Sequence, residues 1–348
     1  MPSGASGQRD VWIDYLRVAA VAAVVVIHVA SRYYYQFGKI DGHVWWTANV
    51  LNALFRWAVP MFVMISGALL LGKKIGIMDF YRKRAVRLLP PLAFWSAFYL
   101  LAKGFLGSGP AHDAGSLLTE FVATGQAHFH LWYLSMFCCL MLFSPFVNGY
   151  ILGERPGNAE YTALLVLFGA LYFLKQAADV ALIAYDVTIN WFMVFPWYLI
   201  YFIYGYRMGR QDIKKRPDNR LLLGLVVLIT AAASGLSAFM ADRHALVMDW
   251  FVLSNTSVLN LALSFAVFCL FKCNAARFKP RRVVAVLADA SFGIYLVHPV
   301  FLHLARRVLP QDDRLALVCM PLSMLLVFTG SAAAIIALRK FRWFRAVC

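Results

Sequence analysis

Long apolar runs separated by short polar segments dominate the chain from end to end. A transmembrane helix needs about 20 mostly apolar residues, and about ten stretches meet that requirement. They cover approximately residues 12–31, 45–71, 90–106, 131–151, 161–183, 191–209, 221–240, 251–271, 288–308 and 315–338. The pattern predicts an all-α, polytopic integral membrane protein, with residues 1–348 forming one transmembrane domain and short tails at 1–11 and 339–348.

The first apolar run has two interpretations. Arg9 precedes it, as a basic residue precedes the apolar core of a signal peptide. The run is long, however, and contains Arg17 and His28, which favours a helix that is retained.

Composition supports a lipid environment. Hydrophobic residues make up 62% of the 348 residues and charged residues 14%, against roughly 45–50% and 25% in soluble domains. This excludes a cytosolic enzyme, and no nucleic-acid partner is expected, because the net charge of +16 fits cytoplasmic loops better than a DNA-binding surface. The six cysteines lie mostly in or beside apolar runs without a C-x-x-C pair, so they read as small buried hydrophobes.

The distribution of positive charge predicts the orientation. With the N-terminus inside, 23 of the 33 Lys and Arg residues fall in cytoplasmic segments, 7 in outer segments and the rest within spans. Cytoplasmic loops carry such an excess. Both termini are therefore predicted to be cytoplasmic, and the longest outer loop covers about residues 107–130.

Arg17 and His28 form the sharpest polar feature of the first span. They are eleven positions apart, with ten residues between them, so on a helix they lie about 20° apart around the axis and roughly 16 Å apart along it. Asp14 stands three residues before Arg17 and can pair with it. Ionisable groups inside spans usually face a cavity or a partner; the alternative is an Arg that reaches the interface and a structural His.

The second span carries Asn49, Asn52 and Arg56 within about 60° of one another on a helix. They form either one wall of the cavity that His28 faces or a structural polar network inside the bundle. Pro60 is expected to kink the helix beneath them. In the fifth span, Lys175 and Asp179 have the spacing of a structural ion pair.

An arginine-rich loop is predicted after the second span, in the sequence from Phe80 to Pro91. Arg84 and Arg87 have the spacing of one helical turn, and Arg82 is nearby. Arginines grouped in this way suit a phosphate-rich ligand. The alternative is a simple signal of membrane orientation.

Other chemical signatures are weak. The chain has no G-x-S-x-G, Walker, H-E-x-x-H or G-x-G-x-x-G motif. His128 and His130 are spaced like a metal pair but lack neighbouring carboxylates, so an outer structural role is favoured and no metal site is predicted.

Taken in order, four sequence segments resemble the membrane acyltransferase-3 family of O-acyltransferases. They are Trp12–Arg17 running to His28; Ala48–Asn52 with Val59–Gly67; Arg84-x-x-Arg87-Leu followed by Pro90; and His130–Leu134 with Ser291–Pro299. The resemblance runs from about residue 11 to 340, and the chain is most similar to the branch that O-acetylates enterobacterial common antigen. Unlike some larger members, the chain shows no appended esterase-like domain, which leaves open whether it completes the transfer alone.

The resemblance implies an activity. Such enzymes take an acyl group, here most specifically acetyl, from cytoplasmic acyl-CoA to a hydroxyl of a cell-surface or lipid-linked glycan. The expected partners are acetyl-CoA as co-substrate, membrane lipid and the saccharide acceptor, and the expected location is the bacterial inner membrane. The acceptor sugar, the choice of acyl group and the oligomeric state stay open.

Roles for single residues follow from this likeness and from helical depth. His28 is expected to be the general base, with an acyl-His intermediate as a second possibility. Asn52 or Arg56 is expected to point at the acyl carbonyl and Asn49 to lie nearer the sugar; the alternative is that Arg56 neutralises a buried Asp. The residues expected to hold the CoA phosphates are Arg17, Arg82, Arg84 and Arg87. The residues expected to contact the acceptor substrate are His130, Trp132, Tyr133, Tyr295 and His298.

A competing class is a transporter or flippase for a lipid-linked sugar, without acyl transfer. Ten spans with interior charges fit a carrier equally well. Transporters often contain repeated halves with broken helices at the midplane, and the halves 1–174 and 175–348 show no matching Gly/Pro-interrupted pair.

Overall fold

The computed structural model describes residues 9–102, 128–183, 195–210, 217–243, 252–310 and 312–348, and these residues contain helices and connections but no strand. The all-α prediction is confirmed. The helices are α1 Val11–Tyr34, α2 Gly42–Phe55, α3 Ala58–Leu70, α4 Ile77–Ala102, α6 Trp132–Glu154, α7 Asn158–Ile183, α8 Phe195–Arg210, α9 Asn219–Arg243, α11 Val258–Cys273, α12 Arg282–Val308 and α13 Ala316–Leu338, with short 3-10 turns at Ala275–Arg277, Asp313–Leu315 and Phe344–Ala346.

Seven helical segments in the described part of the chain are long and apolar enough to cross a membrane. They are α1, α2 with α3, α4, α6, α9, α12, and α13 with the turn before it. The apolar part of α7 and the whole of α11 are shorter. The chain is therefore a multi-pass membrane protein, while the count of ten and the cytoplasmic placement of both termini stay predictions. The side chains of Lys175 and Asp179, and most of the loop 107–130, lie outside the described residues.

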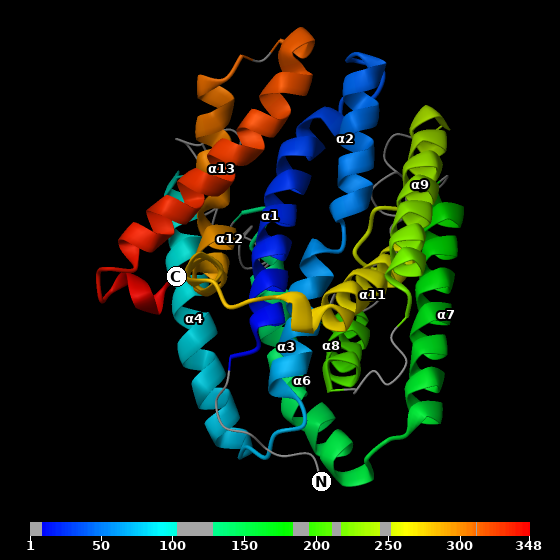
Figure 1. Cartoon of the computed structure of the whole chain (residues 1–348), viewed down its shortest axis with the longest axis vertical. Coiled ribbons are helices and arrows are strands. Elements are labelled where there is room, and N and C mark those ends of the chain that lie inside the picture. Colours follow the sequence, from blue (N-terminus) through cyan, green and yellow to red (C-terminus); the bar gives the residue numbers. More distant parts are fainter. Residues whose placement is uncertain (1–8, 103–127, 184–194, 211–216, 244–251, 311) are drawn as a thin grey trace.

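Helix α1 lies in the middle of the bundle, with α12 and α13 on one side and α2 and α3 on the other (Figure 1). Its buried residues, among them Ile13, Val21, Val29 and Ala30, surround much of the helix. A helix that is apolar nearly all round is stable only when it is enclosed. Its central position therefore fixes the depth of every polar side chain that it carries.

The second predicted span is broken, and the break lies higher than predicted. The helix ends at Phe55, Arg56 and Trp57 form a turn, and α3 starts at Ala58. The cause is Pro60, whose ring clashes with the carbonyl four residues earlier, which belongs to Arg56. That carbonyl accepts a hydrogen bond from Asn260 Nδ2 of α11 at 3.3 Å.

Helix α3 packs against α8 with almost no side chain between the backbones. A Cβ on Gly67 would lie 1.8 Å from the carbonyl oxygen of Phe202, and a Cβ on Gly205 would lie 2.0 Å from that of Met64. Small residues permit this close approach between membrane helices. The contact holds α3 in place, and its neighbouring face, which includes Phe62 and Ser66, faces a cavity.

The predicted loop between Phe80 and Pro91 is wrong. Helix α4 begins at Ile77 and continues through Pro90 and Pro91, so the predicted start of this span at residue 90 is also wrong. Prolines are tolerated in membrane helices where neighbouring groups satisfy the freed backbone atoms. The predicted helical spacing of Arg84 and Arg87 therefore holds within a real helix.

Candidate active site

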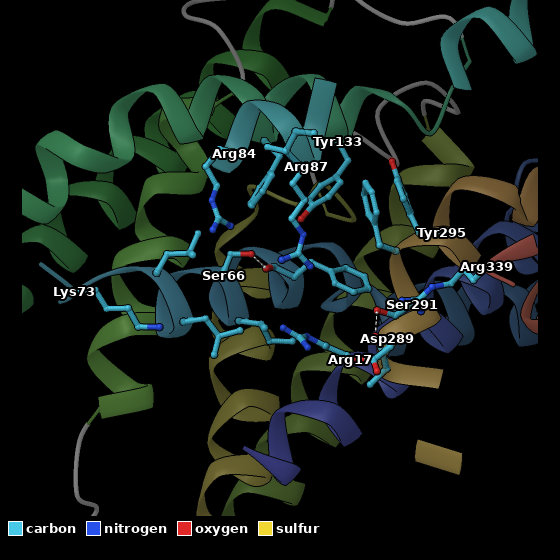
Figure 2. Close-up of a pocket in the computed structure, with 18 residues that line it drawn as sticks. Arg17, Ser66, Lys73, Arg84, Arg87, Tyr133, Asp289, Ser291, Tyr295 and Arg339 are labelled. Carbon is cyan, nitrogen blue, oxygen red and sulfur yellow. Dashed lines mark hydrogen bonds between the residues drawn. The ribbon is translucent and has the colours of Figure 1, made fainter. Parts of the chain in front are cut away.

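A cavity of about 470 Å³ lies between α1, α3, α4, α6 and α12. Its polar lining is dominated by five cations from four separate stretches of the chain: Arg17, Lys73, Arg84, Arg87 and Arg339. Arg84 and Arg87 point into it from one side and Arg17 from the opposite side (Figure 2). We call this space the arginine cavity.

The structure brings together three of the four residues predicted to bind phosphate. Arg17, Arg84 and Arg87 all line the arginine cavity, although they come from α1 and α4. Arg82 is exposed and does not line it. Lys73 and Arg339 also line the cavity, and in the sequence they are marked only by the excess of positive charge in the predicted cytoplasmic segments.

Asp289 is the carboxylate that lines the arginine cavity, and Arg9 neutralises it. Arg9 donates to both carboxylate oxygens of Asp289, at 3.1 and 2.9 Å, and also binds Asp14. These hydrogen bonds, first to Asp14 and then to Asp289, raise the pKa of Arg9 above its usual value. The predicted pairing of Asp14 with Arg17 is confirmed at 3.8 Å. The cavity therefore keeps a large excess of positive charge.

The rest of the arginine cavity is mainly apolar. Phe62, Leu69, Phe137 and Phe292 contribute to its walls. Ser66 donates its hydroxyl hydrogen to the carbonyl of Phe62 at 2.8 Å, and Ser291 likewise to Ala288 (Figure 2). Since both hydroxyl hydrogens are occupied, the serines present only acceptor oxygens. The cavity can hold a ligand with several anionic groups and a long, less polar part.

Tyr133 and Tyr295 also line the cavity, and Tyr295 connects it with a group of histidines. The Tyr295 ring lies 5.5 Å from that of His130 and 6.1 Å from that of His298. Its hydroxyl donates to the carbonyl of His130. Tyr295 therefore contacts both the cavity and the histidines.

The histidine cluster consists of His28 from α1, His298 from α12, and His128 and His130 from the segment before α6. The rings of His28 and His298 are stacked, with centroids 5.0 Å apart and an angle of 23°. The His130 ring lies 5.4 Å from His298. His28 therefore packs against two rings, that of His298 and that of Phe129 at 5.0 Å.

Both nitrogens of His130 have partners. Its Nε2 lies 3.3 Å from the carbonyl oxygen of Leu296, and its Nδ1 lies 2.9 Å from Nδ1 of His128. Tyr99 of α4 donates to the same carbonyl at 2.7 Å. These bonds fasten the segment before α6 to α12. Within the described ranges, no three His, Cys, Asp or Glu side chains converge as metal ligands would.

The polar residues of α2 connect helices. Asn49 donates to the carbonyl of Ser234 in α9 at 2.9 Å. Asn52 donates to the carbonyl of Ala48 at 3.1 Å and accepts from Ser31 at 3.2 Å. Arg56 lies in the turn between α2 and α3. None of the three predicted residues of α2 lines the arginine cavity, so their roles toward a substrate stay predictions.

Trp132 begins α6, and its ring lies 5.9 Å from that of Tyr198, away from the cavity lining. Sequence reasoning missed Tyr99, Ser66 and Asp289. Asp289 had a weak signal, because it is an acid at the very start of a predicted span. Tyr99 and Ser66 sit in apolar runs, and nothing in those runs distinguishes them from core residues.

Comparison with known proteins gives a family match and several similar proteins. Residues 10–338 match the family described as "Acyltransferase domain". The chain is 22% identical over 300 residues to the "Probable poly-beta-1,6-N-acetyl-D-glucosamine export protein" of Staphylococcus aureus strain MSSA476, which covers 83% of this chain and 81% of that protein. It is 28% identical over 150 residues to the "Nodulation protein NolL" of Sinorhizobium fredii, which covers 41% and 39%. No solved structure matches.

Proposed function

Since the chain belongs to the acyltransferase domain family, we propose that this membrane protein moves an acetyl group from acetyl-CoA to a hydroxyl of a glycan or lipid-linked saccharide. One observation carries the proposal. Tyr295 lines a strongly cationic cavity of about 470 Å³, and its ring also lies 6.1 Å from that of His298 in the histidine cluster. A CoA thioester needs both a phosphate site and a place where its acyl group meets a base.

The arginine cavity suits the donor. CoA carries a diphosphate and a 3′-phosphate, and Arg and Lys form strong charge-assisted hydrogen bonds with phosphate oxygens. The volume falls within the range of roughly 300–1,000 Å³ that is usual for small-molecule sites. The apolar walls then accommodate the pantetheine arm as it extends toward Tyr133 and Tyr295. Arg82 does not line the cavity, so it can act on the donor only through long-range electrostatic attraction.

We assign the cavity to the cytoplasmic side of the inner membrane. Lys73, Arg84, Arg87 and Arg339 all come from segments that the charge distribution assigns to the cytoplasm. Acetyl-CoA is made in the cytoplasm of bacteria, so its binding site has to open there. The histidine cluster then lies deeper, toward the outer side from which the acceptor approaches.

The chemical step needs His28 and an electrophilic partner. In direct transfer, a base removes the hydroxyl proton, the oxygen attacks the thioester carbon, the C–S bond breaks and the thiolate takes up the proton. His28 serves either as that base or as the atom that carries the acyl group in between. Arg56 or Asn52 stabilises the negative charge on the acyl oxygen, for which a fixed donor contributes about 3–4 kcal/mol.

The acceptor is assigned to saccharides by two considerations. The Staphylococcus aureus relatives carry the name of a polysaccharide of N-acetylglucosamine. Motif likeness points more narrowly to enterobacterial common antigen. His130, Trp132, Tyr133, Tyr295 and His298 are the residues proposed to face the acceptor.

The test uses purified protein in lipid nanodiscs. Acetyl-CoA binding is measured by calorimetry, with dephospho-acetyl-CoA as the control that lacks one phosphate. Transfer is measured with radiolabelled acetyl-CoA and the membrane glycan fraction of a strain that lacks the gene. We expect saturable binding that is weaker for the control, and alkali-labile label on the glycan. Absence of acetyl-CoA binding overturns the proposal.

A second candidate function is export of a saccharide without acyl transfer. The observation that favours it is the word "export" in the name of the Staphylococcus aureus relatives. The same binding measurement separates the two functions, because a carrier has no need to recognise the phosphates of CoA.

A further inference from the structure

Helix α12 has an unusual backbone group beside the histidine cluster. In an α-helix, each carbonyl accepts from the N–H four residues later. Four residues after Tyr295 stands Pro299, which has no N–H to donate. The carbonyl of Tyr295 is therefore left without its helical donor, and Nδ1 of His298 lies 2.6 Å from it.

This contact determines where the proton of the His298 ring resides. A carbonyl oxygen can only accept, so Nδ1 must be the donor. In a neutral imidazole the other nitrogen, Nε2, then carries the free lone pair. Pro299 and His298 thus act together, because the proline removes one donor and the histidine supplies another that fixes its own tautomer.

The free nitrogen is buried and unused. The His298 side chain is fully buried, with 0% of its surface exposed. Its Nε2 has no hydrogen-bond partner among the described residues. Leaving a buried acceptor unsatisfied costs about 1–3 kcal/mol, so such an atom in a site is best explained by a donor that arrives with the substrate.

The three central histidines differ in this respect. Both nitrogens of His130 have partners, so that ring is occupied structurally. His28 is stacked on the face of His298 at 5.0 Å and 23°, and face-to-face stacking leaves the edge atom Nε2 of His298 open. Tyr295, whose carbonyl fixes the ring, also lines the arginine cavity. His298 therefore stands between the cavity and His28.

We propose that His298 is a further catalytic residue, whose Nε2 accepts the proton of the acceptor hydroxyl. As the O–H bond breaks, the proton moves to Nε2 and the oxygen bonds to the acyl carbon. The bond from that carbon to its leaving group breaks, and the leaving atom takes the electron pair and then the proton from Nε2. The inference rests on the proposed function and changes one part of it, because it moves proton acceptance from His28 to His298.

The decisive variant is His298→Asn. The Asn side chain keeps an N–H near the position of Nδ1, so the bond to the Tyr295 carbonyl can persist while the base is removed. His303→Asn, on the same helix, is the matched control. With radiolabelled acetyl-CoA and the glycan fraction of the strain lacking the gene, we expect kcat to fall by about 10²–10⁴. The KM for acetyl-CoA and the melting temperature should stay as in the wild type.

A second variant tests the tautomer directly. Pro299→Ala restores an N–H that competes for the Tyr295 carbonyl, and Pro321→Ala in α13 is its control. Nitrogen NMR of protein labelled at histidine should show His298 protonated at Nδ1 in the wild type and mixed between the two nitrogens in Pro299→Ala. We expect the kcat of Pro299→Ala to fall several-fold, with acetyl-CoA binding unchanged.

The outcomes separate this inference from the proposed function. Wild-type transfer retained by folded His298→Asn overturns the catalytic role of His298 alone. A wild-type His298 ring protonated at Nε2 overturns it equally. Wild-type protein that binds no acetyl-CoA overturns the proposed function instead, whatever the His298 variants do.

Discussion

The arginine cavity and the histidine cluster meet at Tyr295 but are built in different ways. The cations of the cavity come from α1, from α4 and from the segments that follow α3 and α13. The histidine cluster packs among aromatic rings, and both nitrogens of His130 and one nitrogen each of His128 and His298 bond to backbone or to one another. One region is arranged to attract a charged ligand, and the other to hold neutral side chains in fixed positions.

This difference shows how a membrane protein can bind a charged ligand in one region and accept a proton in another. Charge is inexpensive where water reaches it, and five cations can gather around a ligand that supplies the opposite charge. Deeper in the bundle an ionised group is costly, so neutral imidazoles are the suitable proton acceptors. We therefore expect substitutions in the cavity to change donor binding, and substitutions in the cluster to change the rate of transfer.

The largest effect is expected from His28→Ala. Removing this ring from the cluster should lower acyl transfer by about 10²–10⁴, because His28 acts in the chemical step as acyl carrier or, if His298 is not the base, as general base. Radiolabel transfer from acetyl-CoA measures the loss, and calorimetry should find unchanged donor binding. His43→Ala, an exposed histidine of α2, serves as the control; transfer by His28→Ala at the wild-type rate contradicts the assignment.

The next largest effect is expected on donor binding in the arginine cavity. Replacing Arg84 and Arg87 together with Gln removes charge-assisted contacts of roughly 1.5–3 kcal/mol each. The dissociation constant for acetyl-CoA should rise by tens of times or more, while kcat at saturating donor changes little. Arg281→Gln with Arg282→Gln, two exposed arginines outside the cavity, should leave it unchanged. If both double variants lose affinity for acetyl-CoA equally, Arg84 and Arg87 act only as a signal of membrane orientation.

A smaller effect is expected from Tyr295→Phe, at the boundary between the two regions. The ring stays, but the hydrogen bond from the hydroxyl to the His130 carbonyl is lost. A buried acceptor without its donor costs about 1–3 kcal/mol, so the melting temperature should fall modestly and kcat several-fold. If donor affinity falls instead of kcat, the boundary between the two regions is drawn in the wrong place.

The smallest effect comes from Arg9 and Asp289. Arg9→Gln leaves the carboxylate of Asp289 uncompensated at the edge of the cavity, so acetyl-CoA binding should weaken a few-fold. Asp289→Asn should strengthen it slightly, and the double variant should match Asp289→Asn. Titration at low and high salt checks the cause, because an electrostatic effect fades as salt rises.

The parts of this site that the sequence predicts follow from helical periodicity. Arg84 and Arg87 line one cavity because helical spacing puts them on one side, although the prediction of a loop at this segment is wrong. Arg17 and His28 were placed on one helix stripe and at different depths by the same geometry. The all-α class followed from the length of the apolar runs.

Contacts between distant segments account for what was missed. The stacking of His28 on His298 joins the first and the penultimate described helices, and no single-sequence pattern encodes such a pairing. Lys73 and Arg339 looked like any other cytoplasmic cation until the fold gathered them. The break at Arg56 was placed too low because Pro60 acts on the carbonyl four residues before it.

The close backbone contact between α3 and α8 limits which helices around the cavity can move. Where Gly67 meets Phe202 and Gly205 meets Met64, backbone touches backbone, so no side chain can rotate to let these helices slide. The contact holds α3 as a fixed wall of the cavity, so any widening that admits a bulky donor must come from the other lining helices, among them α4 with Arg84 and Arg87. A covalent link between α3 and α8 should therefore leave turnover intact, whereas a link between α3 and α4 should stop it.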